Sequence, residues 1–218
     1  MKDKVLPFLG FNSFSSDFEF IGSAFLMQPN ILITAGHNIE REENKIYKSF
    51  GTIYNGETLH LSDLIFKEYE NKLITIGEKK DLAIFRLNIN NDSLGAFYPH
   101  ELKKDEKVEI RGYKDYSSKE IDPEVHYSRV TYADFSYQNF PDEYGKAKYS
   151  KYTNCFGVDI KTEPGFSGCP IIKDNLIAGM LIYGFWREIV GARKPKELET
   201  TAIKSTYISR ILTDLMTK

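Results

Sequence analysis

Residues 163–170 read EPGFSGCP, and this stretch carries most of the information about the fold. Its serine, Ser167, lies between two glycines, Gly165 and Gly168. Glycine adopts backbone conformations that other residues avoid, so the chain can turn sharply here and approach a substrate carbonyl. Taken alone, such a run is more often an ordinary tight turn, so the interpretation depends on the rest of the chain.

Two further stretches supply the partners that a reactive serine needs. ITAGHN at residues 33–38 places His37 after an apolar strand, and KDLAI at residues 80–84 places Asp81 before one. An imidazole has to take the hydroxyl proton, and a carboxylate has to hold that imidazole in the right tautomer. The separations are 81 − 37 = 44 and 167 − 81 = 86 residues, which suit a His and an Asp on one lobe and a Ser on another. Their order predicts a His-Asp-Ser triad.

Other catalytic classes fail on the order of their residues. An α/β-hydrolase needs its acid and its histidine after the serine, whereas all four histidines of this chain precede Ser167. A papain-like enzyme also needs a later histidine, which excludes Cys155 and Cys169 as its nucleophile. No pair of histidines has metal-ligand spacing, and no glycine-rich phosphate loop occurs. We therefore expect no metal and no cofactor.

The remaining sequence predicts an all-β protein. Short runs rich in Ile, Val, Tyr, Phe and Thr alternate with Gly, Asn, Asp and Pro, as in a β-sandwich or a β-barrel. Residues 88–93, NINNDS, resemble a connection between two lobes, which we place at about 15–97 and 98–204. A terminal helix is expected at about 205–217, where apolar residues recur every three or four positions and Ser205 can cap the first turn.

Composition narrows the choice of partners and compartment. The 218 residues carry 29 Lys and Arg against 31 Asp and Glu, a net charge of −2, so no nucleic-acid or membrane-surface partner is expected. No apolar run approaches the ~18 residues that cross a bilayer. Pro7 and Gly10 interrupt the apolar start, so we do not expect it to be a secretory leader. Two cysteines suit a reducing compartment, so we expect a soluble, cytoplasmic protein.

The three stretches resemble the motifs of the chymotrypsin-fold (trypsin-like) serine peptidases, which read Thr-Ala-Ala-His, Asp-Ile-Ala-Leu and Gly-Asp-Ser-Gly-Gly-Pro. The resemblance runs from about residue 20 to the C-terminus and is closest to the bacterial branch of glutamyl endopeptidases and HtrA-type proteases. It implies two six-stranded antiparallel β-barrels followed by a C-terminal α-helix. It also implies that His37 is the general base, Asp81 its orienting carboxylate and Ser167 the nucleophile, with Gly165 and Ser167 forming the oxyanion hole.

The chain departs from these relatives at three positions, which changes what we expect of its regulation and specificity. Asn38 stands where the animal enzymes have a cysteine. Phe166 replaces the Asp that pairs with a newly cleaved N-terminus in those enzymes, so that activation switch cannot operate. Leu181 replaces the pocket histidine of the glutamyl endopeptidases, which leaves a strict preference for glutamate in doubt.

The resemblance also places the substrate. An extended peptide would lie beside Ile182, Tyr183 and Gly184, and its side chain would enter a pocket with Lys161 at the floor, Thr162 beside it and Leu181 in the wall. A cationic floor favours an acidic residue before the scissile bond. The alternative, in which Lys161 points to solvent and Leu181 makes the pocket mainly apolar, is equally compatible with the sequence.

Residues 132–152 are rich in aromatic side chains among polar ones, and they are expected on the same lobe as Ser167. One interpretation is that they form the contact for a regulatory protein partner that gates the enzyme. The simpler alternative is that they are strand residues followed by a long surface loop. The polypeptide substrate is the other expected partner. The rival to a serine endopeptidase is a catalytically silent trypsin-like fold that acts as a protein-interaction module.

Overall fold

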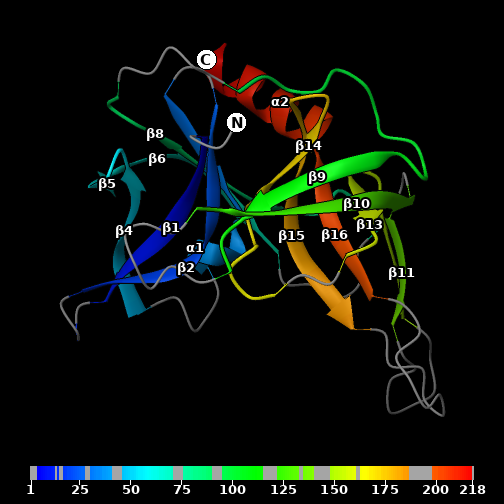
Figure 1. Ribbon diagram of the computed structural model, residues 1–218, viewed down its shortest axis with the longest axis horizontal. Coiled ribbons are helices and arrows are strands. Elements are labelled where there is room, and N and C mark those ends of the chain that lie inside the picture. Colours follow the sequence, from blue (N-terminus) through cyan, green and yellow to red (C-terminus); the bar gives the residue numbers. More distant parts are fainter. Residues whose placement is uncertain are drawn as a thin grey trace.

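The computed structural model describes residues 4–12, 14, 17–27, 30–40, 46–70, 76–89, 95–114, 122–132, 135–139, 148–160, 163–186 and 198–217. Two β lobes lie side by side, and a C-terminal helix lies at one end of the pair (Figure 1). The predicted all-β double barrel with a terminal helix is therefore confirmed. No helix among the described residues has the length and apolarity to cross a bilayer.

The first lobe is a single sheet of seven strands in the order β5-β4-β1-β2-β3-β8-β6. It differs from the predicted six-stranded barrel because one strand is divided. Only Ser62 separates β5 from β6, and these two lie at opposite edges of the sheet, so one bent segment supplies both edges of a curved barrel. The strands are β1 (Val5–Asn12), β2 (Asp17–Met27), β3 (Ile31–Thr34), β4 (Tyr47–Tyr54), β5 (Glu57–Leu61), β6 (Asp63–Tyr69) and β8 (Asp81–Arg86).

Strand β1 begins the first lobe earlier than the expected boundary near residue 15. No strand was expected in this run, where Pro7 and Gly10 argued only against a secretory leader. Pro7 precedes Phe8, where the pairing with β4 starts, so the N–H that proline lacks is not needed in that ladder. The sheet therefore tolerates a proline in a strand that has neighbours on both sides.

The second lobe is a closed barrel of six strands in the order β10-β13-β16-β15-β14-β9. Burial alternates along β9, where Val108, Ile110 and Gly112 are buried, as the two-residue period of a strand requires. Phe156, Leu181 and other apolar side chains fill its interior. The strands are β9 (Lys107–Gly112), β10 (Glu124–Tyr132), β13 (Cys155–Val158), β14 (Pro170–Lys173), β15 (Leu176–Trp186) and β16 (Leu198–Lys204).

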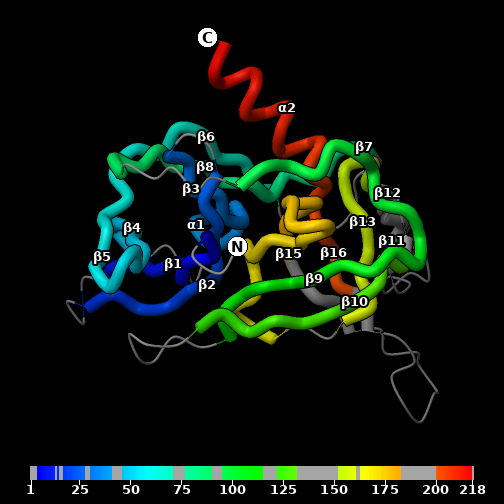
Figure 2. The backbone as a smooth tube through the Cα atoms, turned by 45° about the horizontal axis from the view of Figure 1, so that its top comes forward, coloured from blue at the N-terminus to red at the C-terminus, as the bar shows by residue number. Residues whose placement is uncertain are grey.

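A small third sheet connects the two lobes. It consists of β7 (Ile76–Gly77), β11 (Phe135–Asn139) and β12 (Lys148–Tyr152), with β12 in the middle. β12 pairs antiparallel with β11 and parallel with β7, so the aromatic segment lies against the chain that leads into β8 (Figure 2). Residues 133–134 and 140–147 of that segment lie outside the described residues.

The terminal helix α2 (Ser205–Met216) begins differently from the prediction. Lys204 is the N-cap and makes no side-chain cap bond, while the Ser205 hydroxyl donates to the carbonyl of Tyr98 at 3.1 Å. The buried face of α2, including Tyr207 and Ile208, joins a hydrophobic core to which both lobes contribute. This core lies behind the site described next.

Candidate active site

His37 and Asp81 meet because their strands are neighbours. β3 pairs with β8, and His37 opens the short helix α1 (His37–Glu40) just beyond β3, while Asp81 opens β8. The Nδ1 atom of His37 lies 2.9 Å from Oδ2 and 3.1 Å from Oδ1 of Asp81, and the His37 backbone N–H donates to Oδ1 at 2.8 Å. The two side chains are 2% and 0% exposed. Three contacts in a buried setting therefore fix the orientation of the imidazole.

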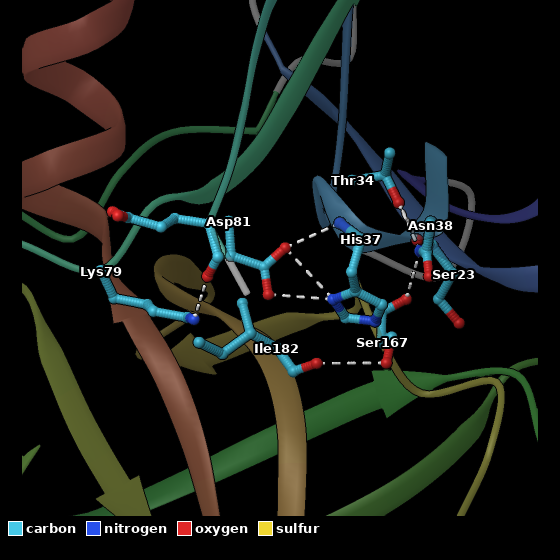
Figure 3. A network of polar contacts seen from close by, with 9 residues as sticks. Ser23, Thr34, His37, Asn38, Lys79, Asp81, Ser167 and Ile182 are labelled. Carbon is cyan, nitrogen blue, oxygen red and sulfur yellow. Dashed lines mark hydrogen bonds and ion pairs between the residues drawn. The ribbon is translucent and has the colours of Figure 1, made fainter. Parts of the chain in front are cut away.

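This contact also decides where the imidazole proton lies. An ionised carboxylate only accepts hydrogen bonds, so in the neutral imidazole the hydrogen lies on Nδ1 and Nε2 keeps its lone pair. Figure 3 shows that the edge of the His37 ring opposite Asp81 faces Ser167. A neutral imidazole oriented in this way can accept a proton from a neighbouring hydroxyl group.

Gly36 allows the close packing that brings His37 to Asp81. A Cβ atom at this position would lie 2.3 Å from the carbonyl oxygen of Glu68 and 2.9 Å from the backbone nitrogen of Leu82. Both of these are main-chain atoms, which cannot move aside without shifting their strands. The close packing of this stretch against Glu68 and Leu82 thus requires glycine at position 36, directly before His37.

Ser167 lies in the turn that precedes β14, on the other lobe. Its Oγ donates to the carbonyl of Ile182 at 3.2 Å, and the side chain lies beside the His37 ring (Figure 3). The side chain is partly exposed, unlike those of His37 and Asp81. The structure therefore brings the three predicted triad residues together.

The turn before Ser167 has the geometry that its sequence predicts. The Phe166 N–H donates to the carbonyl of Glu163 at 3.3 Å, and Gly165 has a φ of +101°. Proline at the second position and a residue of positive φ at the third are the signature of a type II turn, which Pro164 and Gly165 provide. The predicted oxyanion donors, the N–H groups of Gly165 and Ser167, both belong to this stretch.

A buried polar network on the first lobe holds the carbonyl of Ser167, and sequence reasoning missed it. That carbonyl accepts from the Ser23 N–H at 2.8 Å and from Asn38 Nδ2 at 3.1 Å. Asn38 Nδ2 also lies 2.9 Å from Thr34 Oγ1, whose hydroxyl donates to the carbonyl of Ser23 at 2.7 Å. The only sequence signal was that Asn38 stands in the place of a cysteine.

A second group missed from the sequence holds the chain just before Asp81. Asn154 Oδ1 accepts from the Lys79 N–H at 2.7 Å, and its Nδ2 donates to the Lys79 carbonyl at 2.8 Å. The Lys79 ammonium is buried, donates to the carbonyl of Glu70 at 2.7 Å and lies 5.7 Å from the centre of the Tyr152 ring. We call the two Asn154 bonds to Lys79 the lobe clasp, because they join the residue directly before β13 to the residues that precede β8.

The cysteines are unsuited to nucleophilic chemistry. Both thiols are fully buried, and burial raises the pKa of Cys155 and that of Cys169 well above the usual range. The Lys79 cation lowers the pKa of Cys155 by only part of that shift. A thiolate is the reactive form of cysteine, so these residues act as core side chains.

The structure describes only part of the predicted substrate site. Ile182, Tyr183 and Gly184 lie on β15, where a shift in register against β16 falls between Leu181 and Tyr183. The Leu181 side chain is 1% exposed and packs inside the second barrel, so little of its surface is available to a pocket. Lys161 and Thr162 lie outside the described residues, and their role stays a prediction.

Comparison with known proteins supports the fold. No protein-family model and no curated protein matches the sequence. The active form of the Rv3671c protease from M. tuberculosis matches with a TM-score of 0.66 at 13% identity, covering 98% of this chain and 81% of that one. A serine-to-alanine mutant of that protease, in an inactive form, matches with a TM-score of 0.63 at 13% identity and covers 100% of this chain and 88% of that one. The inactive form of the protease matches with a TM-score of 0.61 at 12% identity and covers 98% of this chain and 89% of that one.

At such low identity these matches establish the fold alone. The chain has the trypsin-like protease fold that its three sequence motifs predicted, over nearly its whole length. Activity has to be argued from the residues of this chain.

Proposed function

We propose that this chain is a serine endopeptidase that uses His37, Asp81 and Ser167. The observation that carries the proposal is the buried hydrogen bonding of His37 Nδ1 to Asp81 in a protease fold, with the opposite edge of the ring facing Ser167. A silent interaction module would have no need for a buried carboxylate to hold an imidazole beside the side chain of a partly exposed serine. The alternative function is therefore less well supported.

The geometry supports the following reaction. The Ser167 hydroxyl first turns its hydrogen from the Ile182 carbonyl toward the His37 ring. His37 Nε2 then takes that proton while Oγ bonds to the carbonyl carbon of the peptide, and the carbonyl oxygen becomes negative. The N–H groups of Gly165 and Ser167 stabilise that oxygen. The carbon–nitrogen bond then breaks, the leaving amine receives the proton from His37, and the acyl group stays on Ser167. Water, deprotonated by His37, releases the acid and restores the serine.

Labelling by a fluorophosphonate tests the proposal, because the probe bonds only to an activated serine. We expect the native chain to be labelled and Ser167→Ala to remain unlabelled. Ser167→Ala and His37→Ala should each lower peptide turnover by several orders of magnitude, and Asp81→Asn by about 10⁴-fold through the wrong tautomer.

Ser209→Ala is the matched control, since this partly buried serine lies on α2 away from the site, and its label and turnover should be those of the native chain. Absence of labelling in folded native protein would favour the interaction module. Near-native turnover in any of the three triad variants would contradict the assignment.

We further propose that a protein partner bound to residues 132–152 gates this activity, with the turn at 163–166 inactive or the cleft covered until the partner binds. The support is the connection in the structure: β12 pairs with β7, and the lobe clasp joins Asn154, which lies between β12 and β13, to Lys79. A partner that prefers one position of this segment would shift the protein toward it.

The purified chain tests this gate. We expect it to hydrolyse small peptides slowly, with a kcat/KM below about 10⁴ M⁻¹s⁻¹, the low end of the ordinary range. A fully active purified chain would contradict the gate and leave the triad proposal intact.

A further inference from the structure

The side chain of Ser23 on β2 connects three segments of the molecule. It is 0% exposed, its hydroxyl donates to the carbonyl of Gly165 at 2.8 Å, and its oxygen accepts from the N–H of Tyr113 at 2.9 Å. Gly165 belongs to the turn before Ser167, and Tyr113 directly follows β9. The hydroxyl therefore uses its one donor and an acceptor in two good hydrogen bonds.

The backbone of Ser23 holds the same turn at a second point. Its N–H donates to the carbonyl of Ser167 at 2.8 Å. One residue thus fixes two carbonyl groups, those of Gly165 and Ser167, on either side of Phe166. Fixing a carbonyl oxygen fixes the plane of its peptide group, because the peptide bond is planar.

The turn at residues 163–166 is closed by a weak hydrogen bond of its own, so it depends on contacts with other segments. Its closing bond, from the Phe166 N–H to the Glu163 carbonyl, is 3.3 Å long, which is beyond the usual range for N–H donors. The Lys114–Glu163 ion pair beside it joins two side chains that are 49% and 44% exposed, and such pairs stabilise little. The buried Ser23 bond is the shorter and better protected restraint.

We propose that Ser23 is a positioning residue for the oxyanion hole. Its hydroxyl holds the Gly165 carbonyl and so the peptide plane between Gly165 and Phe166. The Gly165 N–H lies in the preceding peptide plane, and its direction relative to the held carbonyl is set by the φ and ψ of Gly165, whose φ is +101°. Ser23 does not touch the reacting atoms. The inference rests on the proposed function, because it concerns the alignment of one of the two N–H donors in that reaction.

Ser23→Ala removes the hydroxyl and leaves the Gly165 carbonyl and the Tyr113 N–H without this partner. The oxyanion exists only in the transition state and the tetrahedral intermediate, so the loss should appear in kcat. We expect kcat to fall by about 10- to 100-fold, less than or similar to the loss of a whole oxyanion donor, with KM changed less than about threefold. A peptide aldehyde, which forms a tetrahedral adduct with serine, should lose affinity in parallel.

Thr52→Val is the matched control. Thr52 is also buried in the first lobe, and its hydroxyl donates to the Pro7 carbonyl at 2.7 Å, but it does not contact the turn. Both variants lose a buried hydroxyl-to-carbonyl bond, so both should unfold at lower denaturant concentration, while only Ser23→Ala should lose kcat. Equal kcat in the two variants, or a loss in Ser23→Ala confined to KM, would overturn the inference.

A crystal structure of Ser23→Ala keeps the inference separate from the proposed function. We expect the Gly165 carbonyl to have turned away from its native direction. If Gly165 keeps its native φ and carbonyl direction, the inference is wrong even where the chain is a protease. If the turn reorients but the native chain neither hydrolyses peptides nor binds a fluorophosphonate, the proposed function fails and the positioning of the turn by Ser23 stands.

Discussion

Gly165 meets two requirements at once that no other residue type meets. Its φ of +101° lies in the left-handed region, and a Cβ atom there would lie 2.6 Å from the carbonyl oxygen of Tyr113 and 2.7 Å from that of Lys114. The first requirement concerns the residue alone, and the second concerns its surroundings. A comparison of two glycines can separate them.

Gly165→Ala should therefore lower turnover by 10²-fold or more, roughly the effect of losing an oxyanion donor, because the turn has to move to make room. Gly56→Ala is the control: Gly56 has a φ of +81° but open space around the added methyl group. It should cost only the conformational strain, about 1–2 kcal/mol of unfolding free energy, and leave kcat unchanged. Steady-state kinetics and urea unfolding of both variants check this, and native kcat in Gly165→Ala would contradict it.

Single residues also show how much of the site the sequence could predict. His37, Asp81 and Ser167 stand in short motifs whose neighbours are informative, so the sequence indicated which side chains to place together. Ser23 could not be found in this way, because its hydroxyl bonds reach residues 90 and 142 positions away. Lys79 and Asn154 are hidden for the same reason. The catalytic roles of the first three remain predictions until they are tested.

At the scale of elements, the lobe clasp is the connection that local sequence patterns could not predict. The periodicity of a strand or helix indicates which of its faces packs against the core. The clasp depends instead on hydrogen bonds between the turn before β13 and the residues that precede β8, which are far apart in the sequence. The division of the β5–β6 segment at Ser62 and the strand that contains Pro7 were likewise decided by pairing with distant strands. The terminal helix followed from its apolar pattern, whereas the closed second barrel was implied by the resemblance to the trypsin-like peptidases.

Asn154→Ala tests the clasp. It leaves the buried N–H and carbonyl of Lys79 without their partners, so we expect the unfolding free energy to fall by about 2–4 kcal/mol. Turnover should fall as well, because Asp81 follows Lys79 by two positions. Asn154→Asp keeps the acceptor but buries a carboxylate and turns its second oxygen toward the Lys79 carbonyl, so its unfolding free energy should fall at least as far as that of Asn154→Ala. Urea unfolding and kinetics measure both effects, and a native-like Asn154→Ala would show that the clasp restrains nothing.

At the scale of the molecule, α2 fastens the end of the chain to the first lobe. The Tyr207 hydroxyl donates to Glu68 on β6, and Arg210 forms an ion pair of 2.7 Å with Glu78. Apolar side chains of both lobes and of α2 share one core. The shared core and these contacts of α2 thus hold together the two lobes that carry His37 and Ser167. The stability contributed by the Glu68–Tyr207 contact should depend on pH, because Glu68 can gain or lose a proton.

Burial raises the pKa of Glu68 above its ordinary value, and the Tyr207 hydrogen bond and the charge of Lys80 offset part of that increase. The folded chain therefore holds the Glu68 proton more strongly than the unfolded chain does. Between the unfolded-state pKa, about 4.3, and the raised folded-state pKa, the unfolded chain binds fewer protons, so this group's contribution to stability is lost as pH rises.

Two substitutions at this contact should change the pH dependence in opposite directions. Glu68→Gln has no proton to lose, so the fall in unfolding free energy from about pH 4.3 upward should be shallower than in the native chain. Tyr207→Phe removes the hydroxyl that favours the charged carboxylate, so the pKa of Glu68 should rise further and the fall should extend to higher pH. Urea unfolding of the three proteins at several mildly acidic pH values measures these slopes. Equal slopes in all three would mean that Glu68 does not couple α2 to the first lobe, and the joint would then depend on the apolar core and the Arg210–Glu78 pair.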